Sequence, residues 1–122
     1  MAHEVVTVKV SMHAENEISI SVDKEPVHLS GLAEGDEIRW EIHPDSVGWT
    51  FTKHAAGHSV GIGIKDADGV FHDKGGANGQ KHHKWHRKAK DHKLYSYLIS
   101  VTNETVSTNP TTLAWDPSIM ND

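Results

Sequence analysis

Apolar and polar residues alternate in short runs along most of this chain, and Gly, Pro, Asp and Asn bound the runs. Alternation with a period of two is the pattern of half-buried strands, and a helical period is not sustained in any part of the sequence. Several short strands at this spacing predict an all-β fold, an antiparallel β-sandwich formed by a single domain over residues 1–122. The expected strands cover residues 6–12, 18–22, 38–42, 47–52, 60–64, 70–72, 94–101 and 112–115.

Length and composition narrow the classes of protein that fit. A chain of 122 residues with four Trp can build a packed core, and the absence of cysteine excludes disulfides, thiolate metal sites and a cysteine nucleophile. Residues 1–9 lack the basic start and apolar run of a signal peptide, and no stretch approaches the ~20 apolar residues of a membrane span. We therefore expect a cytoplasmic protein with no membrane partner, and no motif indicates a cofactor.

Residues 73–93 break the alternating pattern and predict a flexible loop rich in His and Lys. This segment holds seven Lys or Arg against two Asp, whereas the rest of the chain holds five basic and fifteen acidic residues. The net charge of -5 argues against general nucleic-acid binding, although Trp85 between Lys84 and His86 has the composition of a base-stacking site. Docking of the basic loop on the acidic body of another copy would instead give a homo-oligomer.

Histidine is abundant, with eleven in the chain, and His82, His83 and His86 lie close together in this loop. Imidazole nitrogens are ligands for Zn²⁺, Ni²⁺ and Cu²⁺. A structural zinc site needs four ligands in fixed geometry, however, and the intervening lysines would repel a metal ion. A solvated basic loop is the favoured interpretation, so we predict no metal site.

The Asp116-Pro117 bond is the strongest candidate for chemistry, because a chain can cut itself at such a bond. The aspartyl carboxylate can reach its own carbonyl carbon and form a cyclic anhydride, and the prolyl nitrogen is a more basic leaving group than an ordinary amide nitrogen. Asp116 can act as that nucleophile or as a base that activates water, and the sequence does not choose between them. Tyr95, Tyr97, His92 and Glu25 are candidates for supporting roles such as protonation of the leaving nitrogen.

A second dipeptide, Glu25-Pro26, lies in the run Val22-Asp23-Lys24-Glu25-Pro26-Val27. An early Glu-Pro paired with a late Asp-Pro, in a short all-β chain ending Trp-Asp-Pro-Ser-Ile-Met-Asn-Asp, resembles the bacterial DP-EP family. The resemblance covers the chain end to end, as spacing and strand pattern more than as one long signature. It implies a self-assembling aspartic-type endopeptidase that hydrolyses its own Asp116-Pro117 bond and keeps the C-terminal piece in place, with Glu25 and Pro26 as the other family mark. Together with Tyr97, a candidate from the residues themselves, the predicted site holds Asp116, Pro117, Tyr97 and Glu25.

Two further expectations follow from the same residues. An anhydride can be intercepted by a lysine to give an isopeptide, but Leu94 to Val101 contains no lysine and Lys93 lies at its edge, so no Lys-Asp link is expected. The rival function is a non-enzymatic binding or assembly module in which the basic loop 81–93 carries the interaction and Asp116-Pro117 is only a turn.

Overall fold

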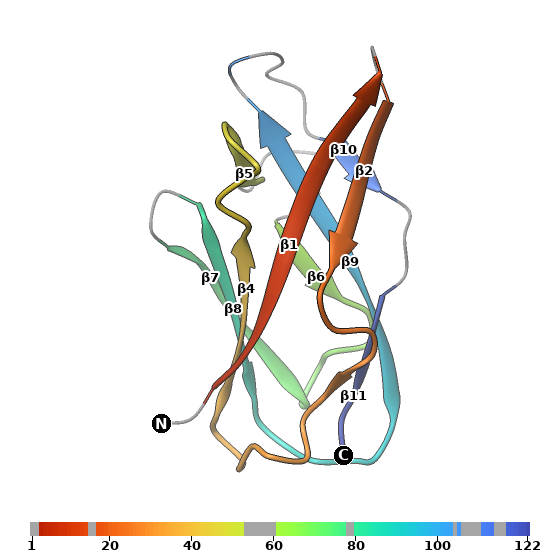
Figure 1. The fold of residues 1–122 in the computed structure, drawn as a ribbon. Helices are drawn as coiled ribbons and strands as arrows, with labels where there is room; N and C mark the ends of the chain where they lie inside the picture. The colour runs from red at the N-terminus through yellow and green to blue at the C-terminus, as the bar shows by residue number, and fades with distance from the viewer. Residues whose placement is uncertain are drawn as a thin grey trace.

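The computed structural model describes residues 3–14, 17–52, 61–77, 80–103, 105, 111–113 and 117–122, and these residues form an all-β fold without a helix (Figure 1). Two sheets are present, one in the order β2-β1-β4-β8-β7 and one in the order β10-β9-β11-β3, with β5 and β6 also paired to β9. None of the described ranges contains a helix that could cross a membrane. The strands are β1 (His3–Ala14), β2 (Glu17–Val22), β3 (Val27–His28), β4 (Glu37–Ile42), β5 (Trp49–Phe51), β6 (Ile62–Ile64), β7 (Phe71–Ala77), β8 (His82–Arg87), β9 (Leu94–Asn103), β10 (Thr111–Leu113) and β11 (Ser118–Met120).

The all-β prediction is confirmed, but the sheets are mixed rather than purely antiparallel. β1 pairs in parallel with β4, and β11 pairs in parallel with β3, while the remaining pairings are antiparallel. Alternation along a strand reports which side chains are buried and carries no information on the direction of the neighbouring strand. The sequence pattern therefore predicted many of the strands, although not β3, β8 or β11, and could not predict these two parallel pairings.

The expectation of a flexible loop over residues 73–93 is wrong for residues 73–77 and 82–87, which lie in strands β7 and β8, whereas residues 88–93 belong to no strand. β7 and β8 form an antiparallel pair at one side of the first sheet, with β8 between β7 and β4. Burial alternates along β8, where His83, Trp85 and Arg87 point inward and the residues between them are half-exposed. The period of two was hidden because two of the three buried side chains are polar.

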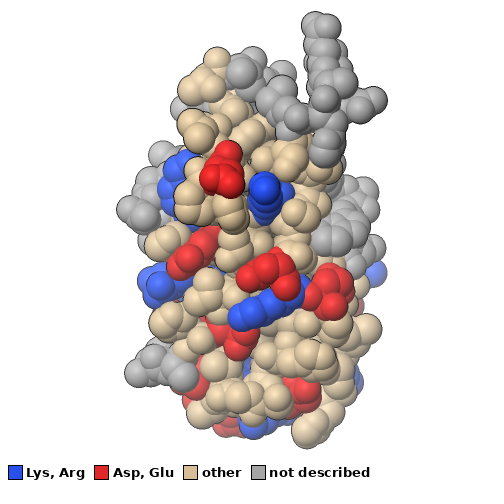
Figure 2. Space-filling view, viewed as in Figure 1, with Lys and Arg blue, Asp and Glu red and all other residues tan. Residues whose placement is uncertain are grey.

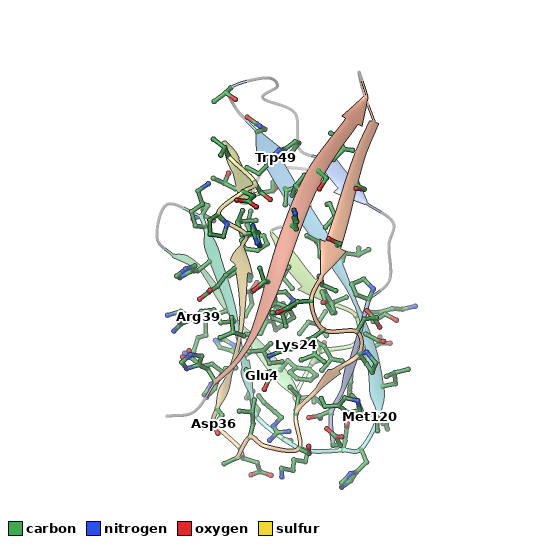
Figure 3. The ribbon with its side chains drawn as sticks, in the orientation of Figure 1. Glu4, Lys24, Asp36, Arg39, Trp49 and Met120 are labelled. Atoms are coloured by element: carbon green, nitrogen blue, oxygen red, sulfur yellow. The ribbon has the colours of Figure 1, made fainter. Side chains whose placement is uncertain are left out.

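Charged side chains of both signs are mixed on the face of the molecule seen in Figure 2. Glu4 of β1 and Lys24 lie next to each other and form an ion pair (Figure 3). On β4, Arg39 Nη1 lies 3.7 Å from Glu41 Oε1. This face is therefore not a patch of a single sign.

Aromatic side chains join the two sheets across the core. The rings of Trp40 on β4 and Tyr97 on β9 meet edge to face with their centres 5.1 Å apart. The indole N–H of Trp85 on β8 donates a hydrogen bond of 2.9 Å to the carbonyl oxygen of Ile62 on β6. The largest fully buried side chains are Trp40, Arg87, Tyr97, Phe51, Leu29, Ile38, Ile62, Ile99, Ile119, Val6, Val8 and Val27.

Replacement of Trp85 by Phe tests the link between the sheets. Trp85→Phe removes the indole donor and leaves the Ile62 carbonyl without it, so we expect the free energy of unfolding to fall by about 1–3 kcal/mol. Urea denaturation followed by circular dichroism measures this loss. Val47→Ala is the control, because Val47 is 81% exposed and its truncation should change stability little. An equal effect of both variants would contradict the link.

Candidate functional site

Glu25 and Pro117, one residue from each X-Pro dipeptide, meet in the second sheet. β11 lies between β3 and β9, with Ile119 opposite Val27 on the parallel side and opposite Tyr95 on the antiparallel side. Continued by two residues, this register places Pro117 between Glu25 and Tyr97. Glu25, Tyr97 and Pro117 are far apart along the chain, and all three were predicted to belong to one site. In this register they lie at one level of the sheet.

Hydrogen bonds hold the residues after the Asp-Pro bond from both sides. The backbone N–H of Tyr97 donates to the Pro117 carbonyl oxygen over 3.0 Å. On the other side, the Glu25 carboxylate accepts the Ser118 backbone N–H at 3.0 and 3.1 Å and the Ser118 hydroxyl at 2.6 Å. Asp116 lies outside the described residues, whereas Pro117 is described and buried.

Proline explains why both dipeptides occur where strands begin. A proline has no backbone N–H to donate to a ladder, so it is found at the start of a strand or at an edge. Pro26 directly precedes β3, and Pro117 directly precedes β11. Because these two strands are parallel, their starts lie side by side, and Glu25 and Pro26 lie beside Pro117 and Ser118. The Glu25-Pro26 peptide bond is cis.

Tyr97, opposite Pro117 in the sheet, has a buried hydroxyl group. Its side chain is 1% exposed, and its hydroxyl has no hydrogen-bond partner within the described ranges. Burial raises the pKa of Tyr97 well above its ordinary value, against a smaller opposing effect of the Trp40 indole, and the negative charges of Glu25 and Asp23 add to the rise. The hydroxyl therefore keeps its proton at any ordinary pH and is free to act as a donor.

The other two supporting candidates make their contacts toward the opposite end of β11, although Tyr95 itself is opposite Ile119. The Tyr95 hydroxyl donates to the Asp91 carboxylate, and burial together with Asp91 raises the pKa of Tyr95 to about 12. His92 is exposed, and its backbone N–H donates to the Asn121 carbonyl oxygen at 2.9 Å. The Tyr95 hydroxyl and His92 therefore lie near Asn121, away from Pro117. Lys93 also belongs to this end, because its carbonyl oxygen accepts the Asn121 N–H.

The histidines of β8 are not arranged as a metal site. His83 is 2% exposed and points into the core, where its Nε2 lies 2.9 Å from Asp73 Oδ1, whereas His82 and His86 lie on the other face of the strand. Residues four apart on a strand are separated by roughly 13 Å. Within the described ranges, no group of three or more His, Asp or Glu side chains is placed to hold a metal ion.

Two features of the site had no signal that sequence reasoning used. Ser118 follows the Asp-Pro directly, and a hydroxyl residue at that position could have been matched to a carboxylate. Arg87 was counted as part of a solvated basic run, yet it is fully buried and contacts the residues at the end of β11. A buried arginine cannot be recognised within a run of charged residues by composition alone.

Comparisons with known proteins do not assign this chain to a family. A scan against protein-family models gave no match, and a search of curated proteins gave no significant relative.

The pair of Asp73 and His83 leads to a prediction about acid stability. Burial raises the pKa of Asp73, but hydrogen bonds from His83 and the Gly75 N–H and the charges of His83 and His72 outweigh it, so the pKa lies below 3.8. A carboxyl group whose pKa is lower in the folded state than in the unfolded state stabilises the fold at pH values above its unfolded-state pKa. This stabilisation is lost as the pH falls through the folded-state pKa. Thermal unfolding should therefore show that the melting temperature of wild type falls more than that of Asp73→Asn between about pH 5 and pH 2.

The exposed Asp68 provides the control for this measurement. Asp68→Asn should follow wild type over the whole pH range. Parallel acid profiles of Asp73→Asn and wild type would show that the pair contributes no stability that depends on pH.

Proposed function

We propose that this protein hydrolyses its own Asp116-Pro117 peptide bond and keeps the severed C-terminal segment in place as strand β11. The observation that carries the proposal is the register of β11, which brings Glu25 and Tyr97 to either side of Pro117. The chemistry then needs no external substrate.

Hydrolysis balances in two steps. The Asp116 carboxylate attacks its own main-chain carbonyl carbon, the bond to the Pro117 nitrogen breaks, and that nitrogen takes a proton as the cyclic anhydride forms. Water then opens the anhydride, which gives the Asp116 side-chain carboxylate and a new main-chain carboxylate with loss of two protons. In the alternative route, Asp116 removes a proton from water and the hydroxide attacks the same carbon. The resulting intermediate then breaks its bond to the Pro117 nitrogen, which takes a proton, and leaves a main-chain carboxylate at residue 116. A group fixed next to its target can contribute about 7–11 kcal/mol through effective molarity in either case.

The leaving group is the best-defined part of the site. Tyr97 N–H holds the Pro117 carbonyl and Glu25 holds Ser118, so the prolyl residue is fixed from both sides. The hydroxyl of Tyr97 carries a proton, is buried, and belongs to the residue opposite Pro117. We assign Tyr97 as the proton donor to the leaving nitrogen and Glu25 as a positioning residue.

The rival function, a binding module that uses residues 81–93, has less support. Trp85 is buried and its indole N–H is bonded to Ile62, so the ring is not exposed for stacking on a base. His83 and Arg87 are also buried, which removes two more side chains from the basic surface that such a module would need.

Mass spectrometry tests cleavage directly. Folded protein kept for days should release a peptide of residues 117–122 only on denaturation. Asp116→Asn should slow the reaction greatly, because an amide is neither a good nucleophile nor a base, and Asp116→Ala should stop it. Pro117→Ala should also slow it, because the leaving nitrogen becomes less basic. The same chain unfolded in urea at equal pH should cleave more slowly, since the tethered geometry is lost.

Two results would overturn this proposal. An intact mass in folded wild-type protein from mildly acidic to neutral pH would exclude self-cleavage. Cleavage of urea-unfolded chains at the same rate as folded chains would reduce the reaction to the ordinary acid lability of an Asp-Pro bond.

Single substitutions separate the two assigned roles. Tyr97→Phe removes only the hydroxyl and should slow cleavage by about 10²-fold, which is the lower end of the rate contribution typical of a general acid. Tyr95→Phe is the matched control, because its hydroxyl is bound to Asp91 at the other end of β11. Glu25→Ala should slow cleavage. Glu25→Gln should keep most of the wild-type rate, because its amide oxygen can still accept the Ser118 N–H.

Equal rates for Tyr97→Phe and Tyr95→Phe in folded protein would exclude the proton-donor role. Equal rates for Glu25→Ala and wild type would exclude the positioning role.

A further inference from the structure

Residues 117–122 occupy a slot that binds them along both edges. β11 has ladder partners on β3 and on β9, and past its end the Leu29 N–H donates to the Met120 carbonyl and the Asn121 N–H donates to the Lys93 carbonyl. Ile119 is 0% exposed, whereas Met120 is partly exposed. The slot therefore buries alternate side chains of an extended segment, as in peptide recognition by strand addition.

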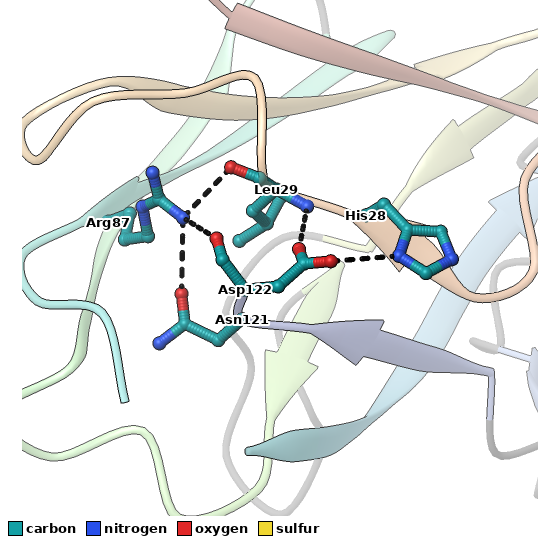
Figure 4. A network of polar contacts seen from close by, with 5 residues as sticks. All are labelled: His28, Leu29, Arg87, Asn121 and Asp122. Atoms are coloured by element: carbon teal, nitrogen blue, oxygen red, sulfur yellow. Dashed lines mark hydrogen bonds and ion pairs between the residues drawn. The ribbon is translucent and has the colours of Figure 1, made fainter. Parts of the chain in front are cut away.

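Arg87 closes the far end of the slot with a buried positive charge (Figure 4). Its Nη1 donates to the Leu29 carbonyl at 3.0 Å, to the Asp122 carbonyl at 3.2 Å and to Asn121 Oδ1 at 3.4 Å. Its Nη2 donates to the Leu32 carbonyl. Without residues 121 and 122, the guanidinium would keep only the Leu29 and Leu32 carbonyls in a buried setting, which is unfavourable for a charge.

Asn121 and Asp122 complete the anchoring with their own side chains. Asn121 is fully buried, and its Nδ2 donates to the Ala89 carbonyl and to Asp91 Oδ1, each at 2.9 Å. The Asp122 carboxylate accepts the Leu29 N–H at 2.8 Å and contacts His28 Nδ1 at 3.1 Å (Figure 4). These contacts require an amide followed by a carboxylate, and a peptide without them would leave buried polar groups unpaired.

We propose that the slot between β3 and β9 is a peptide-binding site, selective for an extended peptide of the pattern Pro-Ser-Ile-x-Asn-Asp. Residues 117–122 are its resident occupant, and a free peptide of the same sequence can replace them once the chain is cut before Pro117. The natural cut rests on the proposed function, but recognition by the slot does not. Selectivity comes from the buried Ile119, from Asn121 against Arg87 and Asp91, and from Asp122.

The test replaces residues 114–116 by the recognition sequence of a site-specific protease. This variant lacks Asp116 and cannot cleave itself, so the external protease alone makes the cut. After the cut, size-exclusion chromatography under native conditions followed by mass spectrometry should find residues 117–122 still bound. A fluorescein-labelled synthetic peptide of residues 117–122 should then exchange into the folded, cut protein at one peptide per chain. Fluorescence anisotropy measures this exchange, in the highest urea concentration that leaves the circular dichroism spectrum of the protein unchanged.

Unlabelled competitor peptides measure the selectivity. The peptide with Asn121→Leu should compete about 10- to 100-fold more weakly, since it leaves Arg87, Ala89 and Asp91 without their partner. The peptide with Met120→Ala is the matched control and should compete within a few-fold of the native sequence, because Met120 is partly exposed. In the protein, Arg87→Met should weaken binding of the native peptide while narrowing the difference between the native and Asn121→Leu peptides.

Three results would overturn the inference. These are loss of the segment from folded protein after the cut, failure of the labelled peptide to enter, and equal competition by the Asn121→Leu and Met120→Ala peptides. Failure of wild-type protein to cleave itself would contradict the proposed function alone and would leave these measurements unaffected.

Discussion

The pairing of β11 with strands of opposite direction is the constraint on which the rest of the structure depends. β11 is parallel to β3 and antiparallel to β9, and a shift by one residue on either side would turn Ile119 out of the core. The same register sets what lies beside Pro117. A change in pairing would therefore disrupt packing and the candidate site together, and the buried Ile119 fixes both.

Arg87 connects this strand to the opposite sheet. It belongs to β8 in the first sheet, yet its guanidinium contacts Leu29, Leu32 and the residues after β11, which belong to the second sheet and its connections. Burial lowers the pKa of Arg87, and the charges of Asp36, Asp122 and Glu34 counter this effect. The buried charge is therefore satisfied mainly by carbonyl oxygens, a geometry that depends on the end of the chain being in place.

Sequence reasoning succeeded where apolar residues mark the inward face, as in β1, β4 and β9, because burial of those side chains dictates the alternation. It failed for β8, where His83 and Arg87 are buried polar residues. It also had no means to place Glu25 beside Pro117, because their proximity comes from a parallel pairing between segments far apart in the chain. Only the resemblance suggested that the two dipeptides belong together, and the resemblance gave no geometry.

The two ends of β11 perform different tasks in this interpretation. Glu25 and Tyr97 fix the segment at Pro117, where a bond would break, and Arg87 with Asp91 fixes it at Asn121, where no bond changes. In the uncut chain the covalent bond before Pro117 keeps the segment at a high effective concentration near its slot, on the order of millimolar for a short tether. A cut removes that tether, and retention then depends only on the contacts within the slot. Because the anchors at Asn121 and Asp122 lie away from the broken bond, cleavage would leave them intact, and the severed strand would retain its place through the contacts that are formed before the reaction.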